Sequence, residues 1–233
     1  MSRSTLLTRE IERLKQRFLF LGGRVEKMLR DAVQSVHDRD RDLAREVVEH
    51  DLEIDDLEVE LEEECLKILA LHQPVASDLR LIVAILKINN DLERVGDLAS
   101  NIAEHTLFLA DRPSVCFPFD FERMATETQE MLRKSLDALV HESAVKAQDV
   151  RVMDDVVDAL HEETYAAVER LIRERPDQLE CAINFIGLSR RLERVADLAT
   201  NIAEDVIYLV EGEIVRHGVE LDDACETRGE ESS

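Results

Sequence analysis

Carboxylate pairs spaced one helical turn apart are the residues of this chain whose chemistry is easiest to interpret. Glu93 and Asp97 are four positions apart, and Glu193 and Asp197 repeat this spacing one hundred residues later. On a helix, the two carboxylates of each pair share one face, and they repel each other unless a proton, an arginine or a bound cation compensates their charge. The spacing therefore predicts two acidic sites that can hold metal ions.

Both pairs belong to a repeated segment. Residues 92–104 read LERVGDLASNIAE, and residues 192–204 read LERVADLATNIAE. On a helix that advances about 100° per residue, the acidic positions fall in one sector and the apolar positions on the other side. A merely solvated face has no need to keep the same residue types in both copies, so we infer that something specific contacts this acidic stripe. Its further members are Arg94, Asn101, Glu104, Arg194, Asn201 and Glu204.

A second set of carboxylates precedes each repeat, again with a spacing of four. If the helices that carry the two sets are antiparallel neighbours, four carboxylates come together in each half. Clusters of oxygen ligands suit hard cations, or iron and manganese, better than zinc, which prefers cysteine and histidine. We leave the metal open among iron, zinc, manganese and magnesium. The candidate metal ligands are Asp51, Asp55, Glu93 and Asp97 in the first half and Asp154, Asp158, Glu193 and Asp197 in the second.

Six long amphipathic segments must position these residues. The spacing of apolar residues predicts helices over about 5–37, 43–71, 77–110, 119–140, 144–173 and 178–212. Pro74 and Pro176 interrupt the pattern, because proline cannot continue a helix. We therefore expect an all-α protein made of two tandem, structurally similar three-helix bundles. The predicted boundaries are 1–110 for the first bundle, 111–118 for a linker, 119–216 for the second bundle and 217–233 for a disordered acidic tail.

Charge and composition narrow the classes of function. The 233 residues include 52 acidic and 29 basic side chains, and a net charge of −23 argues against nucleic-acid binding and favours proteins or cations as partners. No apolar run reaches the roughly 18 residues that a membrane span needs, and the N-terminus lacks the apolar core of a signal peptide. We therefore expect a cytoplasmic protein. The four cysteines form no close pair, and we assign them no chemistry.

These residues resemble the PhoU family of phosphate-signalling regulators. In that family, each half carries a Glu-Arg-hydrophobic-Gly-Asp helix that ends in Asn-Ile-Ala-Glu, and both repeated segments here follow this pattern except at one position of the second. The segment QPVASDLR, residues 73–80, is similar too, and the resemblance extends from the first helix to about Gly212. The chain departs from the family pattern at Ala196, where glycine is usual, and at Leu98 and Leu198, where many members have histidine or another polar residue.

The resemblance implies a regulatory function. Family members are frequently dimers, and they repress the phosphate-starvation response while phosphate is plentiful. They do so by contacting the ATPase subunit of the phosphate ABC transporter and the phosphate-sensing histidine kinase. Some members bind multinuclear iron or other metal clusters at the acidic motifs, which correspond here to the eight carboxylates named above. We therefore expect a non-catalytic, metal-binding adaptor that regulates phosphate uptake negatively, as a homodimer without nucleic acid or a membrane span.

Two other functions remain open on the residues alone. A carboxylate-bridged di-iron enzyme would also use a helical bundle with paired acids, but such a site typically needs Glu-x-x-His on two helices. The chain contains no Glu-x-x-His, and its nearest approximation runs from Asp158 to His161 on one helix. A metal-free structural adaptor is the other alternative. The chain also lacks nucleophile motifs and phosphate-binding glycine loops, which favours a protein that is not an enzyme.

Overall fold

The fold consists of long helices connected by short turns. The computed structural model describes residues 3–112 and 116–212, and this part of the chain contains α-helices, one 3₁₀ turn and no strand. The helices are α1 (Arg3–Asp38), α2 (Arg41–His72), α3 (Ala76–Ala110), α4 (Phe121–Val140), α5 (Ala144–Glu174) and α6 (Leu179–Glu211), with the turn η1 (Pro176–Gln178) before α6. The predicted all-α class is confirmed. The predicted tail and residues 113–115 of the predicted linker lie outside the described residues, and the domain boundaries stay a prediction.

Capping side chains determine where several helices begin. The Asp40 carboxylate accepts hydrogen bonds from the first backbone N–H groups of α2, which satisfies donors that have no partner inside the helix. Asp120 does the same for α4, so this helix begins at Phe121, two residues later than the apolar spacing predicts. At the other end of α2, Gln73 adopts a left-handed backbone conformation with φ 49°, and Pro74 follows it. The turn between α2 and α3 therefore lies where the sequence predicts it.

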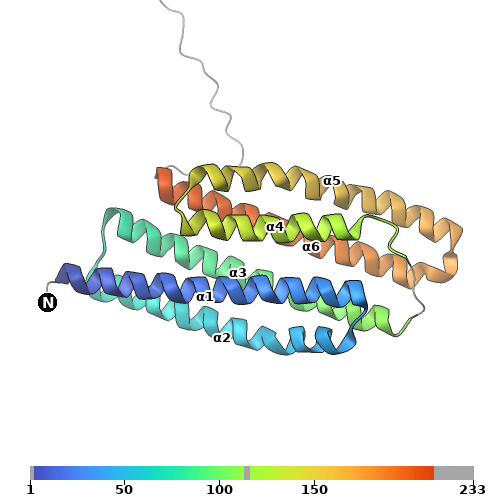
Figure 1. The fold of residues 1–233 in the computed structure, drawn as a ribbon, viewed down its shortest axis with the longest axis horizontal. Coiled ribbons are helices and arrows are strands. Elements are labelled where there is room, and N and C mark those ends of the chain that lie inside the picture. Colours follow the sequence, from blue (N-terminus) through green and yellow to red (C-terminus); the bar gives the residue numbers. More distant parts are fainter. Residues whose placement is uncertain (1–2, 113–115, 213–233) are drawn as a thin grey trace, which may run out of the picture.

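The helices form two bundles that lie side by side with their long axes aligned (Figure 1). Helices α1, α2 and α3 pack together in the first bundle, and α4, α5 and α6 in the second. Helices α3 and α6 also pack against each other, so that one apolar core extends through both bundles. Helices α2 and α5 contact only their own bundle within the described residues. The two predicted bundles are confirmed, and the α3–α6 contact joins them.

Two contacts mark the interface between α3 and α6. The Lys87 ammonium donates to the Asp205 carboxylate at 2.8 Å. Farther along the same interface, His105 packs against Gly187, where a Cβ atom would lie 2.8 Å from His105 Cε1. Gly187 therefore provides the space for this imidazole. Burial, together with the charge of Arg191, lowers the pKa of His105 to about 4, so the ring is neutral at pH 7.

Candidate metal centre

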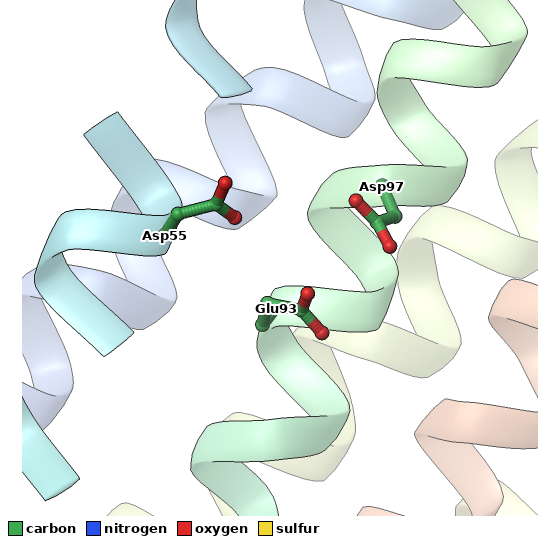
Figure 2. A group of neighbouring side chains, drawn as sticks. All are labelled: Asp55, Glu93 and Asp97. Atoms are coloured by element: carbon green, nitrogen blue, oxygen red, sulfur yellow. The ribbon is translucent and has the colours of Figure 1, made fainter. Parts of the chain in front are cut away.

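Three carboxylates of the first bundle converge between α2 and α3. Asp55 extends from α2 toward Glu93 and Asp97, which stand on successive turns of α3 (Figure 2). One oxygen atom of each carboxylate lies within 4.8 Å of an oxygen atom of the other two. The antiparallel packing of the two helices produces this approach, as the spacing of the four-residue pairs predicts. Carboxylate oxygens gathered at this distance form a donor set for a hard cation.

Asp51 extends this cluster by one turn of α2. Its Oδ1 atom is buried and has no hydrogen-bond partner in the described structure. Burial raises the pKa of Asp51, the charges of Asp97 and Asp55 raise it further, and hydrogen bonding with Ser100 opposes them. A buried carboxylate oxygen without a partner is costly unless a proton or a cation compensates it. Asp51 therefore fits the ligand set of a cation bound beside Asp55 and Asp97.

The electrostatics of Glu93 favour the same interpretation. Burial raises the pKa of Glu93, and the charges of Asp97 and Asp55 add to the effect. The neighbouring Arg94 does not form an ion pair with this cluster, because its guanidinium is 3.8 Å from Asp91 instead. The first cluster thus concentrates negative charge without an arginine from the described residues to balance it. A metal ion would supply that balance.

The second bundle carries the corresponding carboxylates in a looser arrangement. Burial raises the pKa of Asp154 to about 6, with further contributions from Asp158 and Asp197, and its Oδ1 atom is also buried without a partner. Burial and the neighbouring carboxylates likewise raise the pKa of Glu193, while Arg194 acts in the opposite direction. Within the described residues, however, only the first cluster brings three ligand oxygens within 4.8 Å of one another. The two halves therefore differ as metal sites.

The remaining polar residues of the acidic stripe differ in their contacts and exposure. The Asn101 amide donates to the backbone oxygen of Asp97 at 2.6 Å, inside α3. Glu104 is exposed, and its charge contributes to the raised pKa of Asp51. In the second bundle, Glu204 lies 3.8 Å from Arg151 of α5, and Asn201 is exposed. These side chains border the carboxylates in both halves.

Position 58 of α2 and the equivalent position 161 of α5 carry different side chains, and this difference was missed in the sequence. Glu58 accepts a hydrogen bond from the Asn89 amide at 2.9 Å. In the second bundle, His161 Nδ1 lies 2.6 Å from the Ser189 hydroxyl. Position 161 follows position 58 by the same number of residues as Asp154 follows Asp51. Aligning the two halves of the sequence at their Asp-x-x-x-Asp pairs could therefore have revealed this difference. The negative charge of Glu58 contributes to the raised pKa of Glu93. Because a histidine stands at the equivalent position of α5, the first cluster has one more carboxylate beside it than the second.

The chain is similar to known proteins along most of its length. The PhoU domain matches residues 19–106 and again residues 121–206. The chain belongs to the PhoU family. The phosphate-specific transport system accessory protein PhoU homolog of Pseudomonas aeruginosa is 39% identical to it, over 89% of this chain and 86% of that protein. The PhoU protein of Escherichia coli is 33% identical, over 91% of this chain and 89% of that protein.

Solved PhoU structures share the fold. The crystal structure of PhoU from Pseudomonas aeruginosa superposes with a TM-score of 0.84 at 38% identity, over 88% of this chain and 99% of that one. The phosphate transport system regulatory protein PhoU from Streptococcus pneumoniae gives a TM-score of 0.80 at 29% identity, over 91% and 100% of the two chains. The resemblance to the PhoU family is therefore confirmed. None of the described helices has the length and apolar character needed to cross a membrane.

Proposed function

We propose that this PhoU-family protein restrains phosphate uptake and the phosphate-starvation response. The observation that supports this most is the PhoU domain that matches the chain twice, together with relatives that are named as accessory proteins of a phosphate-specific transport system. In this proposal, the protein is a non-catalytic cytoplasmic adaptor and a homodimer. It contacts the ATPase subunit of the phosphate ABC transporter and the phosphate-sensing histidine kinase. Its strongly acidic charge agrees with protein and cation partners rather than nucleic acid.

The proposal includes a metal ion at the first carboxylate cluster. Asp55, Glu93 and Asp97 would hold it, with Asp51 beside them, and this set of oxygen donors suits magnesium, manganese or iron. The unpartnered Asp51 oxygen and the raised pKa of Glu93 both support a cation at this position. Bound there, the ion supplies positive charge that links α2 to α3. Asp154, Asp158, Glu193 and Asp197 are proposed as a second site of the same class.

Complementation of a deletion strain tests the regulatory function. A starvation-promoter reporter is measured at ample phosphate together with the protein level on a blot. Deletion of the gene should activate the reporter, and the wild-type gene should restore repression. A reporter that stays silent after deletion would contradict the proposed function.

Two double variants in the same strain separate the acidic sites from the fold. Asp97→Ala with Asp197→Ala removes an exposed carboxylate from each half, which should cost only about 0.5 kcal/mol per site. This variant should accumulate normally yet repress incompletely. Leu98→Asp with Leu198→Asp places charge on buried positions and should eliminate the protein by unfolding it. Full repression by the alanine variant at equal abundance would show that these two aspartates are not needed.

A further inference from the structure

The outer face of α2 carries apolar side chains that the bundle does not use. Leu52, Val59 and Leu66 follow one another at intervals of seven residues, and 72%, 51% and 52% of their surfaces are exposed. Helix α2 packs on α1 and α3 alone within the described residues, and it lies along the outer edge of the first bundle (Figure 1). Apolar residues at every seventh position lie along one line of a helix surface, where a second helix can contact them. We call these three residues the α2 line.

The second bundle provides an internal control for the α2 line. When the two halves are aligned at their Asp-x-x-x-Asp pairs, the three positions of the α2 line correspond to Asp155, Glu162 and Glu169 of α5. All three are exposed. The same place in the duplicated fold therefore accepts three carboxylates. Apolar side chains are thus not required there to build a three-helix bundle. Three exposed apolar residues in one line, which the fold does not require, are a candidate contact surface for a partner.

Carboxylates flank the α2 line and indicate what kind of partner it fits. By the helical repeat, Glu49, Asp56 and Glu63 border one side, with Lys67 at its C-terminal end, and Asp55 and Glu62 border the other. None of these five carboxylates forms an ion pair within the described residues, whereas three arginines of α1 pair with other acids of α2. Those pairs are Arg24 with Glu53, Arg17 with Glu60 and Glu64, and Arg13 with Glu64.

This charge pattern discriminates between candidate occupants. A second copy of the chain would place the same carboxylates against themselves, and an anionic membrane surface would repel them. A helix with an apolar line flanked by lysine or arginine would match both the apolar residues and the charge. We propose that the α2 line is a docking surface for a basic amphipathic helix of a partner protein. The role of that partner in phosphate regulation rests on the proposed function, whereas the docking chemistry does not.

A designed peptide tests the docking chemistry with the full-length protein. The probe is a synthetic helix of three heptads with leucine at the first and fourth positions of each heptad and lysine at the flanking positions. Its control carries glutamate in place of lysine. We expect the lysine peptide to bind in fluorescence anisotropy, the glutamate peptide not to bind, and the affinity to fall as salt is added. Equal binding of the two peptides would overturn the proposal.

Substitutions locate the binding on α2. Leu52→Asp, Val59→Glu and Leu66→Glu together give α2 the residues that α5 carries at these positions, and they should weaken binding of the lysine peptide by more than about tenfold. The loss is diagnostic because the variant is more acidic, so purely electrostatic attraction would increase. The matched control, Val145→Glu with Val152→Glu, removes two exposed valines from α5 and also adds negative charge, and it should not weaken binding. Undiminished binding by the triple variant would overturn the proposal.

The reporter strain and sedimentation complete the test. In the deletion strain at ample phosphate, the triple variant should fail to repress at normal abundance, whereas the α5 control should repress. Repression by the triple variant at the wild-type level would overturn the inference. If the gene deletion itself leaves the reporter silent, the proposed function fails and the peptide experiment alone decides the inference.

If the triple substitution converts a dimer into a monomer in sedimentation, a second copy occupies the α2 line and the proposal is wrong.

Discussion

Gly96 of α3 lets Ile54 of α2 approach so closely that a Cβ atom at position 96 would lie 3.1 Å from Ile54 Cγ2. This contact adjoins Asp55 and Asp97, and it therefore sets the spacing across which the first carboxylate cluster forms. In the second bundle, the equivalent positions carry Val157 and Ala196, so the side chain of α5 is smaller where the residue of α6 is larger. This exchange accounts for the alanine where the family usually has glycine.

The exchange predicts an energetic coupling. Gly96→Ala gains about 1 kcal/mol in helix propensity but must displace the buried Ile54, which costs about 1–3 kcal/mol. Ile54→Val alone should cost about 1 kcal/mol. In the Gly96→Ala background the same substitution should cost less, because valine lacks Cδ1 and has more room to shift away from the new Cβ, as in the pair of the second bundle. Urea unfolding of the four proteins measures this coupling, and strictly additive losses would contradict it.

Divalent cations should stabilise the protein through the first cluster. Binding to the native state alone raises the midpoint of thermal unfolding by mass action. Glu93→Gln should remove most of the shift produced by manganese or magnesium. The matched variant Glu193→Gln should remove less, because ligand oxygens are within 4.8 Å of one another only in the first cluster of the described structure. If sodium chloride at equal ionic strength reproduces the whole shift, charge screening explains it and no site is needed.

His105 should make stability depend on pH at the bundle interface. Its pKa is about 4 in the folded protein and 6.5 ordinarily, so between these values the unfolded chain binds the extra proton. Stability is therefore lost as the pH falls, by about 2 kcal/mol between pH 7 and pH 5. His105→Gln should remove this contribution. The measurement is the difference in unfolding free energy between variant and wild type at each pH, and a constant difference would contradict the prediction.

Glu64 should depend on its arginines for the stability of the first bundle. Its carboxylate is buried on α2, 2.6 Å from Arg17 and 3.6 Å from Arg13. Arg17→Met should destabilise the protein by about 2 kcal/mol, because a buried charge loses its nearer partner. Adding Glu64→Leu should restore much of the loss, since no charge then remains to be paired. Chemical unfolding compares the two variants, and equal destabilisation by both would show that the ion pair is not the cause.

The helices were largely predictable because apolar periodicity and helix-breaking residues act locally. Pro74 and Pro176 are close to the breaks that the structure has, and every predicted helix end agrees with the observed one within two residues. The packing of α3 on α6 was not predictable, because periodicity tells which side of a helix is buried but not what covers it. The four-residue spacings did predict that Asp55 would meet Glu93 and Asp97. The contribution of Ser100 depends on side-chain packing across helices, which no spacing encodes.

The contacts between α3 and α6 pair the same two positions of the repeat twice. Lys87 meets Asp205, and Gly187, the counterpart of Lys87, meets His105, the counterpart of Asp205. This reciprocity is the pattern of an isologous interface, in which one patch binds its own copy about a two-fold axis. Carrying both copies in one chain makes the association intramolecular, so dilution cannot separate them. The two sides no longer have to be identical, and each could acquire its own residues: an ion pair at one end and a neutral imidazole at the other.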